Sequence, residues 1–258
     1  MPRTFTFLGT GTSVGVPMVG CECRTCTSPN PKNQRWRCAA VVQTSQGHLL
    51  IDAPPELRLQ LLRARVPLVH ALLLTHFHAD HLFGLDDVRV FPQRLGGSLP
   101  IYCNAETEVV IRRNFAYAFE SQSAMTYSFV PQLHFETINP GQPFQALGET
   151  VIPIALEHAQ FNVLGFRIGN LAYCTDVSNI PPESMQLLEG LEVLVLDALR
   201  YKPHPAHLSI SQAVKLADRL KPKQTWLTHM SHDLEHEETD ASLPENVRLA
   251  YDTLSFAF

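Results

Sequence analysis

The 258-residue sequence has few of the features that direct a chain to a membrane or to nucleic acid. Its apolar runs all fall short of the ~20 residues that span a bilayer. Lys and Arg number 20 against 25 Asp and Glu, a net charge of −5, so no basic surface for a polyanion is indicated. The N-terminal residues have neither the apolar stretch nor the cleavage site of a signal peptide. We therefore expect a cytoplasmic protein with no nucleic-acid partner and no membrane partner.

Linkers, low-complexity segments and internal repeats are also missing from the sequence. Hydrophobic residues make up 45% of the chain, which is enough for a large core and too many for a disordered protein. At roughly 150 residues per domain, the length allows one large domain or two small ones. Because no linker divides the chain, we expect one domain over residues 1–258.

The hydrophobic pattern predicts short strands in both halves of the chain, with helices between them. Strands are expected at residues 4–8, 39–44, 48–51, 71–75, 101–103, 127–130, 135–138, 150–156, 163–168, 171–174, 193–196 and 225–228. Helices are expected at residues 56–65, 82–91, 105–119, 183–188 and 209–220. Leu57, Leu61 and Leu62 would form the buried face of the first helix, and Ser209 would cap the last. This order suits two sheets with helices outside them.

The strongest chemical signal is the segment Thr-His-Phe-His-Ala-Asp-His at residues 75–81, at the end of an expected strand. Imidazole nitrogens and carboxylate oxygens are good ligands for borderline divalent metals. His76 and His78 alternate, so both can face one metal from an extended loop. Asp80 and His81 follow after the chain turns and would face a second metal.

This pattern resembles the hallmark of the metallo-β-lactamase superfamily. The resemblance implies an α/β fold, an αββα sandwich of two mixed sheets with helices on the outer faces, and a metal site at the edge between the sheets. His158, Asp176 and His229 each follow an expected strand, in the order in which the superfamily places its later ligands. The resemblance implies one metal on His76, His78 and His158, a second on Asp80, His81 and His229, and Asp176 as the bridge between them.

A narrower resemblance joins Gly15-Val16-Pro17 to the Cys-x-Cys-x-x-Cys segment at residues 21–26. This segment, with the later Thr-His-Met-Ser-His at residues 228–232, is similar to the PhnP-like phosphodiesterases of the phosphonate pathway, which open a cyclic phosphate on ribose. The cysteines have metal-ligand spacing. The resemblance implies a structural zinc, on a Cys-rich loop at about residues 15–38, held by Cys21, Cys23, Cys26 and His232.

The alternative for these three cysteines is that they are free or redox-active. Cys38, Cys103 and Cys174 lie in apolar contexts and are expected in the core. The glycines at residues 9, 11 and 15 follow a strand, but their interval is wrong for a dinucleotide-binding loop, and a Cys cluster follows them in place of a helix. A nucleotide cofactor is therefore not expected.

Several further residues are candidates through the same resemblance. Similar enzymes carry a histidine beside the substrate phosphate in the setting of His207, which makes His207 a candidate acid for the leaving alkoxide, with His204 as a nearby rival. Asp52 resembles the superfamily's aspartate that orients a ligand or the loop. Asp197 would orient His207 or serve structurally. The sequence departs from the family pattern at Ala53-Pro54-Pro55, where many members have a glycine, and this leaves the shape of that loop open.

Together these residues predict a binuclear metal-dependent phosphoric diester hydrolase, with a metal-bridging hydroxide that attacks a small phosphodiester, cyclic by resemblance. His207 and Asp176 would be its catalytic residues. Other hydrolases of the superfamily (an RNA-processing nuclease, a lactonase or a thioesterase) are alternatives, and a redox protein or an inactive scaffold would be a different class. The catalytic metals are expected to be Zn or Mn, with Fe or Ni as alternatives, because mixed nitrogen and oxygen sites accept all four. A homodimer rests on the resemblance alone.

Overall fold

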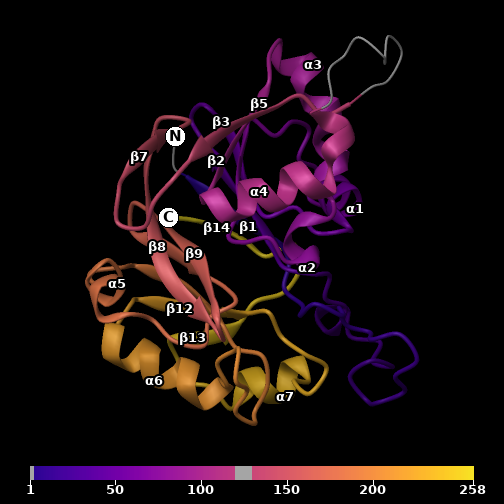
Figure 1. Cartoon of the computed structure of the whole chain (residues 1–258). Coiled ribbons are helices and arrows are strands. Elements are labelled where there is room, and N and C mark those ends of the chain that lie inside the picture. The colour runs from indigo at the N-terminus through magenta and orange to yellow at the C-terminus, as the bar shows by residue number, and fades with distance from the viewer. Residues whose placement is uncertain (1–2, 120–129) are drawn as a thin grey trace.

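The computed structural model describes residues 3–119 and 130–258, which form two seven-stranded sheets packed face to face (Figure 1). The first sheet, in the order β14-β1-β2-β3-β4-β5-β6, contains β1 (Thr4–Gly9), β2 (Ala39–Thr44), β3 (Gly47–Ile51), β4 (Ala71–Leu73), β5 (Leu99–Cys103), β6 (Leu133–Thr137) and β14 (Ser255–Ala257). The second, in the order β13-β12-β11-β10-β9-β8-β7, contains β7 (Phe144–Ala146), β8 (Glu149–His158), β9 (Phe161–Ile168), β10 (Leu171–Cys174), β11 (Val193–Asp197), β12 (Gln224–Thr228) and β13 (Val247–Leu249).

Helices cover the outer face of each sheet, and Figure 1 shows α1 and α4 beside the first sheet and α6 beneath the second. The α-helices are α1 (Leu57–Arg63), α2 (Ala79–Leu82), α3 (Phe91–Leu95), α4 (Ala105–Asn114), α5 (Pro182–Gln186), α6 (Ile210–Leu220) and α7 (His236–Ala241). The 3-10 helices are η1 (Pro31–Asn33), η2 (Leu85–Val90) and η3 (Ala116–Ala118). The expected αββα sandwich of two mixed sheets is therefore confirmed. Within the described ranges, no helix has the length and apolar character needed to cross a membrane.

Three clusters of buried side chains fill the spaces between the four layers. Phe5 and Phe7 of the first sheet pack against Phe166 and Tyr173 of the second. The other two clusters lie between each sheet and its own helices. In β11 the residues alternate between the inner cluster and the helix-facing cluster, so every position is buried. This explains why the central strands are continuously apolar in sequence.

The segment after α2 corrects the predicted helix over residues 82–91. The chain forms α2, η2 and α3 in succession, and the N–H of Gly84 donates to the Ala53 carbonyl at 2.8 Å, outside any helical ladder. A Cβ on Gly84 would lie 1.9 Å from the Pro54 carbonyl oxygen, so only glycine allows this contact. Pro92, which has no N–H, then lies in the first turn of α3. The Ala-Pro-Pro loop, whose shape the sequence left open, therefore packs tightly against the residues that follow the His-rich segment.

The other local predictions had mixed outcomes. Leu62 is 63% exposed, and Gln60 takes the buried face of α1 because its side-chain amide donates to the Arg37 carbonyl. The helix predicted over residues 105–119 ends at Asn114, and η3 follows. Ser209 does cap α6, in a capping box with Gln212. A strand was also predicted over residues 127–130. Residues 127–129 of that prediction lie outside the described residues.

The parallel strands of both sheets end at the edge where the predicted site residues lie. β3 and β4 are parallel, as are β10, β11 and β12. Asp52 follows β3, the His-rich segment follows β4, Asp176 follows β10, Asp197 ends β11 and His229 follows β12. Because parallel strands direct their carboxyl ends to one edge, this topology gathers residues that are far apart in sequence.

Candidate metal centre and active site

The seven predicted ligands come together in two groups that share Asp176. Within each group, one candidate ligand atom from every residue lies within 4.8 Å of the others. The Oδ2 atom of Asp176 lies 3.8 Å from Nε2 of His76, and Oδ1 lies 3.2 Å from Nε2 of His81, so the carboxylate faces both groups. The groups are His76, His78, His158 and Asp176, and Asp80, His81, Asp176 and His229. This is the division that the family resemblance implied, while the roles as metal ligands stay predictions.

The imidazole nitrogens in this centre fit a divalent metal. Among the described residues, the buried Nε2 atoms of His76, His81 and His229 have no hydrogen-bond partner. Burying a polar atom without a partner is costly, so such a cluster calls for a ligand. Two ligands about 2.1 Å from one ion lie roughly 3.0–3.5 Å apart. The nitrogen-to-carboxylate distances around Asp176 are 3.2–3.9 Å. The residues present therefore fit a pair of metal ions.

The charges of the centre favour a cation. Burial disfavours a protonated His81, but Asp176 and Asp80 outweigh burial and hold the pKa of His81 well above its usual value. Burial likewise opposes a raised pKa at His229, yet Asp176 raises that pKa to about 9. His76 lies farther from the carboxylate oxygens, and burial holds its pKa well below the usual value. The carboxylates that raise the pKa values of His81 and His229 give the centre a negative potential, which divalent ions would neutralise.

Asp52 supports one imidazole in each group. Its buried carboxylate accepts hydrogen bonds from Nδ1 of His81 at 2.7 Å and from the N–H and hydroxyl of Thr75. Because the Thr75 hydroxyl donates to Asp52, it accepts from Nδ1 of His76 at 2.9 Å. Both imidazoles therefore direct Nε2 into the centre. The sequence indicated Asp52 for this role but not Thr75, whose only signal was its place next to His76.

Three site residues adopt the left-handed backbone conformation directly after a strand. The φ angles of Asp52, Asp176 and His229 are 64°, 57° and 59°. Residues other than glycine rarely adopt this conformation, which costs on the order of 1–2 kcal/mol per residue. Aspartate tolerates it better than most residues. The turns direct Asp176 and His229 into the centre and Asp52 toward the imidazole that it supports, so the local strain is part of how the site is built.

Replacing Asp52 with asparagine is expected to weaken metal binding by about 10- to 100-fold. Asparagine has a single acceptor oxygen, and its amide N–H₂ would face a donor, either Nδ1 of His81 or Thr75. Competition with a coloured chelator measures the affinity. An Asp52→Asn protein that binds metal as tightly as the wild type would show that Asp52 does not hold the ligands in place.

His207 lies next to both groups, between two proposed ligands. Its ring centroid is 4.6 Å from that of His229 and 4.7 Å from that of His158. Nδ1 of His207 donates to Oδ2 of Asp197 at 2.9 Å, which leaves Nε2 to face a substrate. The same oxygen accepts the N–H of Val177. Asp197 was predicted either to orient His207 or to serve structurally. This hydrogen bond is the contact that the first role requires.

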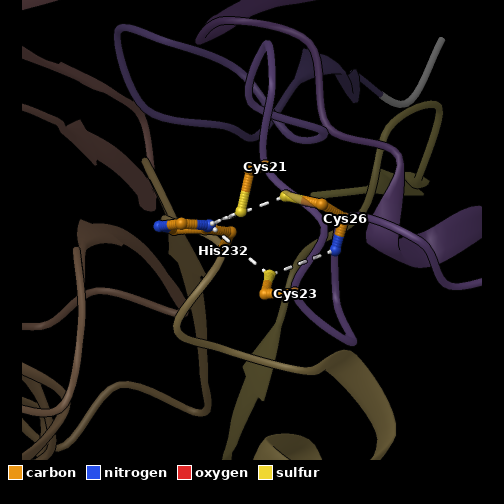
Figure 2. Close-up of side chains that lie close together, drawn as sticks. All are labelled: Cys21, Cys23, Cys26 and His232. Carbon is orange, nitrogen blue, oxygen red and sulfur yellow. Dashed lines mark hydrogen bonds between the residues drawn. The ribbon is translucent and has the colours of Figure 1, made fainter.

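The cysteine cluster forms a separate four-residue site (Figure 2). Figure 2 shows the sulfur atoms of Cys21, Cys23 and Cys26 around the His232 ring. The three sulfur atoms lie 3.1, 3.5 and 3.6 Å from Nδ1 of His232. A tetrahedral zinc, about 2.3 Å from sulfur and 2.1 Å from nitrogen, would space these atoms roughly 3.6 Å apart. A hydrogen bond from the Cys26 backbone lowers the pKa of Cys23 to about 6, which favours the thiolate that zinc binds. These residues fit a structural zinc.

Buried Arg35 holds the cysteine loop against the C-terminal part of the chain. Its guanidinium donates to the carbonyls of Ser231 at 2.9 Å and Leu234 at 2.7 Å. Lys32 forms an ion pair with Glu237 of α7, and Figure 1 shows the indigo loop near that helix. The expected zinc would therefore add to the contacts that already join the cysteine loop to the C-terminal part of the chain. Its ligand His232 is three residues from His229. Cys38, Cys103 and Cys174 are buried, as predicted.

Comparison with known proteins identifies the family. A family model for the beta-lactamase superfamily domain matches residues 48–230. The chain belongs to the beta-lactamase superfamily. A solved structure described as a new diphosphatase from the PhnP family is 42% identical, with a TM-score of 0.93, and the match covers 100% of this chain and 98% of that one. Within the beta-lactamase superfamily, the chain therefore belongs to the PhnP family.

Two other similar proteins say less about this chain, one because its sequence identity is low and the other because it is matched over half of its length. Zn²⁺-bound PqqB from Methylobacterium extorquens is 18% identical, with a TM-score of 0.73 and coverage of 99% and 100%, and shows the same fold. A Porphyromonas gingivalis protein named octanoyltransferase is 36% identical over 96% of this chain. The chain spans about half the length of that curated relative, 50%. Membership of the beta-lactamase superfamily and the similarity to a diphosphatase agree with a metal-dependent hydrolase, and the fold implies divalent metal ions.

Proposed function

We propose that the protein is a binuclear metal-dependent phosphodiesterase that hydrolyses a small phosphodiester, with a cyclic phosphodiester as the first candidate. The observation that carries the proposal is the placement of Asp176 between two groups of ligands, with His207 next to both. A substrate phosphate at such a centre would have its charge met by the metals. The surface then needs no excess of basic residues, in agreement with a net charge of −5.

The chain's own residues prepare the centre for this reaction. When bound, a pair of divalent ions supplies a water of lowered pKa and positive charge against the phosphate oxygens. Asp52 and Thr75 hold His81 and His76 so that Nε2 of each faces inward. The Ala206 carbonyl orients His158 in the same way, because it accepts a hydrogen bond from Nδ1–H of His158 at 2.8 Å. These contacts fix the ligands before a substrate binds.

His207 would supply the proton for the leaving group. Protonated His207 holds one proton on Nδ1, bonded to Asp197, and a second on Nε2. As the bond between phosphorus and the leaving oxygen breaks, the Nε2 proton moves to that oxygen, and His207 becomes neutral. Water supplies the new oxygen on phosphorus, so a phosphomonoester and a hydroxyl group form, and in a cyclic substrate both remain on one molecule.

A second candidate is a diphosphate, because the 42% identical PhnP-family relative is described as a diphosphatase. The two substrates share the bond that would be cleaved, from phosphorus to a bridging oxygen. Octanoyl transfer is not carried over to this chain, because the chain matches only half of the relative with that name.

A panel of substrates tests the proposal. Metal-loaded protein is supplied with bis(p-nitrophenyl) phosphate, ribose 1,2-cyclic phosphate, cyclic nucleotides, a nucleoside diphosphate ester, lactones and thioesters. His78→Ala serves as the control, because any activity that it retains would come from a contaminant or from another site. Hydrolysis of the phosphoric esters alone supports the proposal. Turnover confined to lactones or thioesters would overturn it.

Replacing His207 with alanine is expected to lower kcat by about 10²- to 10⁴-fold for an alkoxide leaving group. The loss should be much smaller for p-nitrophenolate, which departs without a proton. Steady-state kinetics on ribose 1,2-cyclic phosphate and bis(p-nitrophenyl) phosphate measure both. Equal losses on the two substrates would rule out His207 as the acid.

A further inference from the structure

His204 lies beside His207, outside both groups of proposed metal ligands. Its Nδ1 accepts a hydrogen bond from the N–H of Ala206 at 3.2 Å. A nitrogen that accepts cannot carry a proton, so the proton of the neutral ring is on Nε2. The loop between β11 and α6 therefore presents His204 as a hydrogen-bond donor at Nε2.

The imidazoles of the site form a series in which His204 is the outer member. The rings of His229 and His207 are 4.6 Å apart, and those of His207 and His204 are 5.2 Å apart. His207 is buried, whereas His204 is partly exposed. A substrate whose leaving oxygen contacts His207 would extend from the metals past His207 toward His204.

We propose that His204 is a substrate-binding residue that determines specificity for the leaving group. Its Nε2–H donates a hydrogen bond to an oxygen next to the scissile ester oxygen, either a sugar hydroxyl or ring oxygen or a second phosphate. The inference rests on the proposed function, because it takes the leaving group to lie beside His207. It favours substrates with an oxygen-rich leaving group over simple aryl esters.

The charges around His204 agree with a neutral donor. Burial and the neighbouring His207 and Arg200 lower the pKa of His204. Asp197, which raises it, is bonded to His207 and to the Val177 N–H. A neutral donor binds sugar oxygens and phosphate oxygens alike.

A purely structural role makes a different prediction. Ala206 donates its N–H to His204 and accepts Nδ1–H of His158 at its carbonyl. If His204 served only to hold Ala206, its loss would disturb His158 and hence metal binding. Metal content therefore separates the two roles.

Kinetics of His204→Ala and His204→Gln test the proposal, with ribose 1,2-cyclic phosphate as the oxygen-rich substrate and bis(p-nitrophenyl) phosphate as the aryl ester. For His204→Ala we expect KM for the cyclic phosphate to rise about tenfold, because one hydrogen bond is lost in a partly solvated site. The change in kcat should stay below about threefold. The loss of kcat/KM should be at least about threefold smaller for the aryl ester, and metal content should match the wild type. Glutamine, whose amide N–H₂ reaches a similar position to Nε2, should restore most of KM.

Three results would overturn the proposal: an unchanged KM, equal losses on both substrates, or metal loss in His204→Ala that His204→Gln shares. Wild-type protein that hydrolyses neither ester would instead show that the proposed function itself is wrong. If the wild type hydrolyses both esters and His204→Ala matches it, the function stands and only the role of His204 fails.

Discussion

Asp176→Ala protein should lose both catalytic metals and nearly all hydrolytic activity, with kcat/KM reduced on the order of 10³-fold or more. The carboxylate lies between the two groups, 3.8 Å from Nε2 of His76 and 3.3 Å from Nε2 of His229. Removing it deletes a ligand from each group. It also removes the negative charge that separates the histidines of one group from those of the other. Asp80 contacts only the second group, so Asp80→Ala should lose one metal and Asp176→Ala two.

Plasma emission spectrometry on dialysed protein counts the metals, and hydrolysis of bis(p-nitrophenyl) phosphate gives the activity. Asp218→Ala, an exposed carboxylate on α6, is the matched control and should resemble the wild type. Circular dichroism confirms that each variant is folded. If folded Asp176→Ala bound as much metal as Asp80→Ala, the bridging role would be wrong.

Replacing Cys23 with serine should release the structural zinc and destabilise the protein. Zinc that exceeds its dissociation constant about 1,000-fold contributes roughly 4 kcal/mol to the free energy of unfolding. For a chain of this size that corresponds to a Tm lower by roughly 8–16 °C. Arg35 and the ion pair of Lys32 with Glu237 still hold the loop, so the variant should fold. Activity should fall as well, because His232 is three residues from His229.

Thermal denaturation with and without a zinc chelator measures this effect. The chelator should lower the Tm of the wild type toward that of Cys23→Ser and leave the variant unchanged. Cys103→Ala removes a buried sulfur from the core instead, and it should keep its zinc and its response to the chelator. A Cys23→Ser protein with wild-type zinc content would contradict the four-residue site.

The His-rich segment at residues 75–81 stands out by its side-chain chemistry, and the later ligands were located through the family resemblance. Asp176 and His229 follow parallel strands, and parallel strands place such residues at one edge. His158 was expected after its strand and is instead the last residue of β8. The side-chain chemistry of residues 75–81 pointed to metal without any knowledge of tertiary contacts.

The contacts that support the ligands could not be predicted in this way. The Ala206 carbonyl holds His158 across 48 residues, and Arg35 reaches carbonyls almost 200 residues away. Backbone carbonyls have no signature in sequence, so such partners appear only in the folded chain. The left-handed turns at Asp176 and His229 were hidden for the same reason.

Helix breaks and edge strands also escaped the sequence pattern. The helix over residues 82–91 failed because Gly84 must pack against Pro54. Short edge strands such as β13 and β14 have only three residues, too few to show a period. Their place in the sheets depends on pairing with β12 and with β1, and β1 lies at the opposite end of the sequence from β14.

The most direct test of a two-metal centre with a separate zinc site is the metal content of protein purified without added metal. The structure offers two groups around Asp176 and one around Cys21, Cys23, Cys26 and His232. We predict about three metal ions per chain, of which one is zinc that resists dialysis. About one metal per chain, even after incubation with Zn or Mn, would contradict the account.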